Sequence, residues 1–98
     1  MNKNSSSPSI TIVPVPQTES HDVEVRARST TRHRVTVSPD YLRELGLETI
    51  PTSQVLHEAL RFLLEREPNT SILARFDLRE IERYFPEFRQ EIARRLEQ

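Results

Sequence analysis

The amino-acid sequence predicts a mainly α-helical fold with one short β-strand near the N-terminus. Residues 32–37, Arg-His-Arg-Val-Thr-Val, alternate between polar and apolar side chains, which is the period of a strand. Two segments with apolar residues at helical spacing follow directly and end near residue 67. One strand of this length cannot form a sheet by itself. We therefore expect the chain to complete its fold with a second copy.

Three regions of the 98-residue chain differ in composition. Residues 1–20 contain a serine run and several prolines, which predicts a disordered or extended tail, although Ile10 to Val13 could pair as an edge strand. Residues 21–67 hold the strand and the two helices, and residues 68–98 hold further helical patterns. The net charge of −1 means that any nucleic-acid contact must come from local charge.

A second alternating segment precedes the predicted strand. Residues 22–28 place Val23 and Val25 on one side, as His33 and Val35 lie on one side of residues 32–37. The link between the two segments contains neither Gly nor Asn and does not favour a tight hairpin. Whether residues 22–28 pair as an extra strand or form an irregular lead-in stays open.

Helix boundaries are marked by residues that suit particular positions. Ser38 followed by Pro39 fits the start of a first helix, and Gly46 fits its left-handed end. Thr52 follows Pro51 at the start of a second, strongly apolar helix. Residues 77–80, Asp-Leu-Arg-Glu, fit the pattern of a capping box, and residues 87–97 predict a last amphipathic helix.

Composition excludes several functional classes. The chain has no cysteine and one glycine, so it has no thiolate metal site, disulfide or glycine-rich phosphate loop. Its three histidines lack ligand spacing, and its carboxylates interleave with arginine as on a solvated helix face. We expect no enzyme activity, no metal and no cofactor. Without an apolar run of about 20 residues, we expect a cytoplasmic protein that does not enter the membrane.

The block from Arg32 to Leu64 resembles the ribbon-helix-helix superfamily of DNA-binding dimers, in its basic strand, its Ser-Pro-Asp helix entry and its second helix. The resemblance implies a ribbon-helix-helix homodimer with additional C-terminal helices, whose paired strands enter the major groove of operator DNA. It implies that outward-facing strand residues read bases and that the start of the second helix holds a phosphate. The implied DNA-binding residues are Arg32, Arg34, Thr36, Thr52 and Ser53.

Many members of this superfamily are antitoxins of bacterial toxin–antitoxin pairs, so the resemblance implies an antitoxin that represses transcription of its own gene. In such proteins a C-terminal arm wraps the cognate toxin. The aromatic segment after residue 68 suits that role, because amphipathic helices commonly bind apolar grooves. The implied partner-binding residues are Phe76, Leu78, Ile81, Tyr84, Phe85 and Phe88.

Each of these assignments has an alternative in the same residues. The arginines could belong to a solvated edge strand that charge protects from aggregation. The aromatic segment could form the domain's own core, since helical spacing does not separate a core stripe from a binding stripe. The near-neutral charge and the apolar surplus on the helices also fit a small protein–protein adaptor or assembly subunit without DNA binding.

Overall fold

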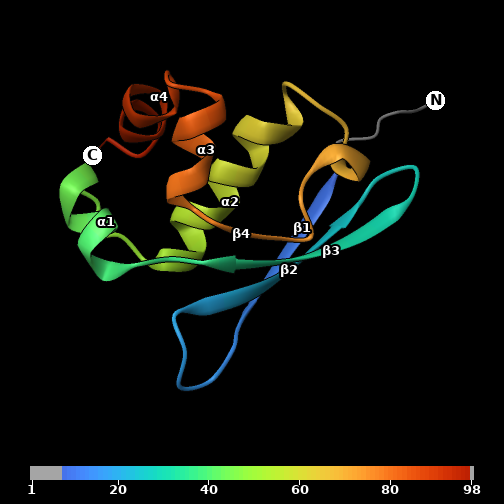
Figure 1. The fold of residues 1–98 in the computed structure, drawn as a ribbon, viewed down its shortest axis with the longest axis horizontal. Helices are drawn as coiled ribbons and strands as arrows, with labels where there is room; N and C mark the ends of the chain where they lie inside the picture. The colour runs from blue at the N-terminus through green and yellow to red at the C-terminus, as the bar shows by residue number, and fades with distance from the viewer. Residues whose placement is uncertain (1–7, 98) are drawn as a thin grey trace.

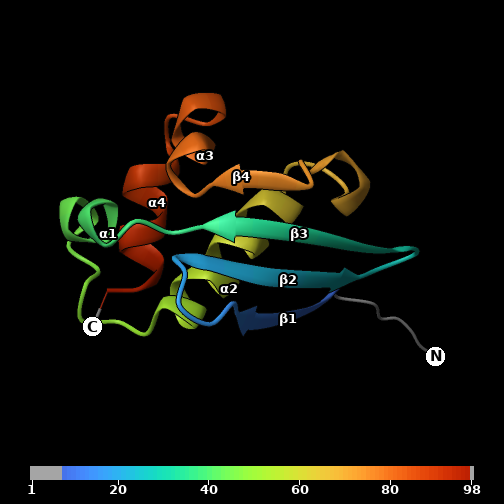
Figure 2. The ribbon, with the colours of Figure 1, turned by 60° about the horizontal axis from the view of Figure 1, so that its bottom comes forward.

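A computed structural model describes residues 8–97 of the chain. These residues form a four-stranded mixed sheet in the order β1-β2-β3-β4. The strands are β1 (Ser9–Pro14), β2 (Ser20–Arg26), β3 (Thr30–Thr36) and β4 (Arg75–Asp77). The first three strands are antiparallel, and β4 joins β3 in parallel. Figure 2 shows the sheet face-on, with β1 at one edge and β4 at the other.

The helices gather on one face of this sheet, as Figure 1 shows. They are α1 (Pro39–Leu45), α2 (Thr52–Leu64), α3 (Arg79–Tyr84) and α4 (Phe88–Arg95). A short 3-10 turn, η1 (Asn69–Ser71), connects α2 to β4. The other face of the sheet is open, so the described part of the chain is a two-layer α/β structure.

The predicted fold class is wrong. The sequence predicted a mainly α-helical chain with one short strand in a ribbon-helix-helix dimer, whereas residues 8–97 contain a mixed sheet. The physical reason lies in β2, which pairs with β3 through a hairpin within the same chain. On its other side β3 pairs with β4, which lies about 40 residues further on. The strand that a ribbon would take from a second copy is thus supplied by the chain itself.

The strand β1 lies within the predicted N-terminal tail of residues 1–20. Ser9–Pro14 pairs antiparallel with β2, which is the edge-strand alternative that the sequence left open. Pro14 ends the strand at an edge, where a missing N–H is tolerated. Residues 1–7 of the predicted tail lie outside the described residues.

Several local predictions are confirmed. Ser38 caps α1 by accepting a bond from the Asp40 N–H, with Pro39 as the first helical residue. Gly46 ends that helix with φ of 73°, in the left-handed region that favours glycine. The predicted second helix begins at Thr52. Local backbone chemistry sets these boundaries, which is why they could be read from the sequence.

One hydrophobic core joins the sheet to the helices. Val23, Val25 and Val35 point from the sheet into the helical layer, where α2 contributes a broad apolar face. The C-terminal segment shares this core, because Phe88 and Ile92 of α4 are fully buried within it. The rings of Phe62 and Phe88 meet edge to face with centroids 5.1 Å apart. Residues 68–98 are therefore packed with the rest of the domain as far as they are described.

Candidate protein-binding site

The arginines of β3 lie on the open face of the sheet, opposite the helical layer. Arg34 Nε donates to Asp22 Oδ1 of β2 at 2.8 Å, and Arg32 Nη2 donates to Glu24 Oε2 at 3.3 Å. The bond from Arg34 lowers the pKa of the Asp22 carboxyl and raises that of the arginine. Each cation of the predicted ribbon thus already has a carboxylate opposite it in the same sheet.

The remaining predicted DNA-binding residues lie elsewhere. Thr36 is half-buried, and its Oγ1 lies 3.2 Å from the Ser20 hydroxyl oxygen. Thr52 and Ser53 begin α2, in the layer that covers the other face of the sheet. The structure therefore does not bring the arginines and the helix start onto one basic surface. The open face instead carries charges of both signs around a shallow hollow lined by Asp22, Glu24, Arg32, Arg34 and Arg75.

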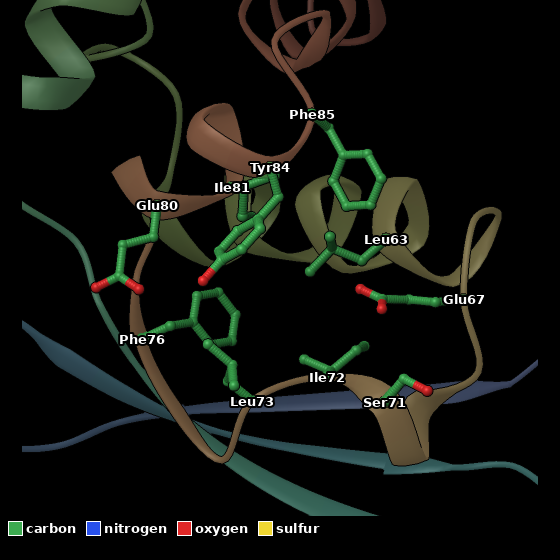
Figure 3. A pocket seen from close by; sticks show the side chains of 10 residues that line it. All are labelled: Leu63, Glu67, Ser71, Ile72, Leu73, Phe76, Glu80, Ile81, Tyr84 and Phe85. Carbon is green, nitrogen blue, oxygen red and sulfur yellow. The ribbon is translucent and has the colours of Figure 1, made fainter.

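A second hollow, which is mainly apolar, opens between α2, η1, β4 and α3 (Figure 3). Its volume is about 210 Å³. Phe76 from β4, Ile81 from α3 and Leu63 from α2 line it and are buried. We call this hollow the Tyr84 pocket; its lining residues are Leu63, Glu67, Ser71, Ile72, Leu73, Phe76, Glu80, Ile81, Tyr84 and Phe85.

Two large hydrophobic side chains at the pocket are left in solvent. Tyr84 is 66% exposed and Leu73 is 51% exposed, in a structure that buries most of its other large apolar residues. An apolar hollow with exposed hydrophobic neighbours is the usual mark of an interaction site rather than of a core. Tyrosine is also among the residues that contribute most to protein interfaces.

The predicted partner-binding residues divide into two groups. Phe76, Ile81, Tyr84 and Phe85 line the pocket, and among these Tyr84 is exposed. Leu78 and Phe88 are completely buried in the domain's own core. The sequence did not assign Leu63 or Glu67 to this surface, since both belong to the end of the α2 pattern and gave no separate signal.

Acidic side chains stand at opposite ends of the pocket. Glu80 of α3 and Glu67, which follows α2, lie on opposite sides of it in Figure 3. Both are half-buried, and within residues 8–97 neither has a cationic partner. By contrast, Glu44 and Glu82 nearby each bind arginine side chains. The pocket therefore presents negative charge that the described residues do not neutralise.

Buried hydrogen bonds hold the pocket walls. The phenol of Tyr41 in α1 donates to Glu82 Oε1 in α3 at 2.6 Å, and burial raises the pKa of that phenol further above its ordinary range. Asn69 in η1 is buried, and its amide donates to the Ser29 carbonyl oxygen at 3.0 Å. These bonds fix α3 against α1 and the turn η1 against the β2–β3 hairpin.

Within the described residues, no group of three or more potential metal ligands is found. No helix among them is long and apolar enough to span a lipid bilayer. No protein-family model matches the chain, and no curated protein and no solved structure matches it significantly.

Proposed function

We propose that this protein is a small protein-binding module that recruits a partner through the Tyr84 pocket. The observation that carries the proposal is the exposure of Tyr84 and Leu73 beside an open apolar hollow. This function corresponds to the adaptor alternative that the sequence left open. It requires no second copy and no nucleic acid.

The size of the pocket suits one large apolar side chain from the partner. Burying such a side chain contributes about 1.5–3 kcal/mol. That free energy alone supports weak binding, so the partner must also cover the Tyr84 ring and the Leu73 side chain to reach useful affinity. The interface we propose is therefore a short segment with one anchoring residue, and not a large preformed surface.

Charge restricts the partner further. Because Glu67 and Glu80 lack cationic partners among the described residues, a Lys or Arg on either side of the apolar anchor would gain a carboxylate. An acidic segment would be repelled from the same surface. We infer that the partner segment carries a Leu, Ile or aromatic residue with a basic residue close to it in sequence.

A bacterial toxin is one partner that this chemistry allows, so the protein-binding half of the antitoxin hypothesis stays a proposal. Cytoplasmic location also stays a proposal, compatible with the absence of cysteine. The DNA-binding half receives less support, since β3 is paired on both sides and Arg32 and Arg34 bind acids of β2.

The direct test is selection of short peptides from a random library on the immobilised full chain, followed by affinity measurement with purified peptides. Tyr84→Ala and Leu73→Ser should each weaken the selected peptides about tenfold or more, as expected for residues that contribute over 1.4 kcal/mol. Arg83→Ala is the matched control, because Arg83 is exposed on α3 beside Tyr84 and does not line the pocket. Its effect should stay within about twofold, well below one such step.

The charge requirement has its own readout. Selected peptides should be enriched in Lys or Arg near the apolar anchor, and Glu67→Gln combined with Glu80→Gln should remove the salt dependence of their binding. Peptides that bind the Tyr84→Ala variant as tightly as the parent protein would refute the proposed site.

A further inference from the structure

The edge strand β1 carries none of the charges by which edge strands usually avoid pairing, and its one proline lies at its last position. Its sequence, Ser-Ile-Thr-Ile-Val-Pro, contains no charged residue and is rich in β-branched side chains. It is six residues long, and Val13 is 54% exposed. A strand of this kind at an open edge favours the addition of another strand. In Figure 2 no other strand of the described residues lies beside β1 on its outer side.

The hydrogen-bond alternation identifies the backbone groups that face outward. The Val15 N–H donates to the Ser20 carbonyl oxygen at 3.0 Å. The backbone N–H and C=O groups of odd-numbered residues near the end of β1 therefore point towards β2. In an antiparallel ladder the direction alternates along the strand. The backbone groups of Ile10 and Ile12 therefore point away from β2 and into solvent.

Prolines bracket these two residues. Pro8 and Pro14 occupy the next outward-facing positions on either side, and proline has no N–H to donate. Ile10 and Ile12 are then the donors of the open edge, and they lie symmetrically about Thr11. An arrangement that is symmetric about one residue is self-complementary under a twofold axis.

We propose that two copies of this chain pair antiparallel along β1, with the twofold axis at Thr11. In this register the Ile10 N–H and C=O meet those of Ile12 in the second copy, and the reciprocal pair forms on the other side of the axis. The two Thr11 residues face each other at a non-hydrogen-bonded position, where opposite side chains lie close together. Two sheets thereby join into one continuous sheet.

Side chains at this edge support a second copy as the occupant. Ile10 and Ile12 face the helical layer but are only half-buried, and a hollow beside Ile10 is lined by Leu64 of α2. Arg61 and Glu65 line the same hollow; they are ion-paired with Glu58 and Arg95 within the subunit, but both side chains remain about half exposed and bring both signs of charge to this edge. The assembly should also stop at two copies. The two prolines limit the ladder along β1, and β4 at the opposite edge has only three residues, which is too short to pair with a further copy.

A charge exchange at Thr11 tests this proposal. We expect the full chain to sediment as a dimer in a concentration series by analytical ultracentrifugation. Thr11 is exposed, so Thr11→Lys and Thr11→Glu should both fold, while each places like charges across the axis. Each variant alone should dimerise at least roughly tenfold more weakly, and an equal mixture of the two should restore dimers by opposite charge.

Control variants separate this interface from the Tyr84 pocket and from a general effect of added charge. Thr49→Lys places the same charge on the exposed loop between α1 and α2 and should leave the dimer unchanged. Thermal unfolding at low protein concentration checks each monomer, because Thr11 pairs with Glu24 within the subunit. Tyr84→Ala should also leave the dimer unchanged, which distinguishes this proposal from the one on the pocket.

A parent chain that stays monomeric throughout the series would overturn the inference. So would dimers that persist in both single variants, or a mixture that fails to restore them. Binding of a different protein's strand at β1 of a monomeric chain would likewise contradict it.

Discussion

His33 Nδ1 lies 2.8 Å from the carbonyl oxygen of Leu73, which follows it by 40 residues. Because a carbonyl oxygen can only accept, this ring nitrogen carries the proton. His33 Nε2 then accepts from the Thr31 hydroxyl at 2.8 Å, and Thr31 accepts from the Asn69 amide at 2.9 Å. A partly buried chain of hydrogen bonds thus connects the β2–β3 hairpin to the segment that presents Leu73 at the pocket.

Replacing His33 with Leu should destabilise the protein by about 1–3 kcal/mol, because the Leu73 carbonyl oxygen would lose its buried donor. Urea unfolding measures this change. His57→Leu is the matched control, since His57 is exposed on α2, and it should change the free energy of unfolding by less than about 0.5 kcal/mol. Equal midpoints for the His33 variant and the parent protein would show that the network contributes nothing to stability.

Tyr41→Phe should remove the hydrogen bond from the Tyr41 hydroxyl in α1 to Glu82 in α3 and keep the buried aromatic ring. The expected cost is about 1–2 kcal/mol, since Glu82 retains Arg89 at 3.0 Å. The Tyr41 hydroxyl is the largest cause of the lowered pKa of Glu82, so that pKa should rise towards its ordinary value in the variant. Denaturant unfolding and an NMR titration measure the two effects. Tyr84→Phe, at an exposed phenol, serves as the control and should leave both quantities unchanged.

Acid should destabilise the fold below about pH 4.5. Hydrogen bonds from Arg94 and then Arg95 lower the pKa of Glu91 from 4.5 to about 2, and arginine partners lower those of Glu44 and Glu65. A carboxyl whose pKa is lower in the folded state contributes stability above its unfolded pKa of 4.5, and that stability is lost as the pH falls through the folded value.

The window for Glu91 therefore runs from pH 4.5 down to about 2. Unfolding free energies measured across this range should fall less steeply for Glu91→Gln than for the parent chain. Glu48→Gln, at an exposed loop position, should leave the slope as it is. A parent protein whose stability is constant from pH 5 to pH 2 would contradict the prediction, since the linkage relation requires a slope.

DNA binding through the open sheet face stays a prediction with a clear signature. If a duplex bound there, Arg34→Ala should weaken it by about 1–3 kcal/mol. Asp22→Asn should strengthen it, because it would release Arg34 from the carboxylate that holds it at 2.8 Å. Fluorescence anisotropy at several salt concentrations measures both. Because Arg34 is paired with Asp22, we expect no binding of DNA at this face and no change in either variant. Weaker DNA binding by Arg34→Ala together with stronger binding by Asp22→Asn would revive the repressor hypothesis.

Most local features of this chain could be predicted from its sequence. The alternation around Val35, the Ser38 cap, the Gly46 helix end and the apolar stripe of α4 are confirmed, and the segment around Val23, which the sequence left open, forms β2. Each depends on residues within a few positions of one another. Side-chain period, capping and backbone freedom act over that range, so no tertiary contact is needed to recognise them.

The candidate site was only partly predictable. Tyr84 and Phe88 both belong to apolar C-terminal stripes, yet one is exposed at the pocket and the other is buried against Phe62. Periodicity reports that a face is apolar but not what covers it. The position of α2 relative to α3 and α4 decides which residue becomes core and which stays available to a partner.

The sequence by itself determined the cap and the end of α1, the start of α2, the strand period of β3 and which faces are apolar. Only the tertiary structure decided which strands pair. Arg34 pairs with Asp22 across the hairpin, and β4 joins β3 from a distant part of the chain, so β3 is not free to form the predicted ribbon with a second copy. Strand pairing depends on contacts between segments far apart in sequence, whose free energy is the sum of many packing and hydrogen-bonding terms. A local pattern does not contain that sum.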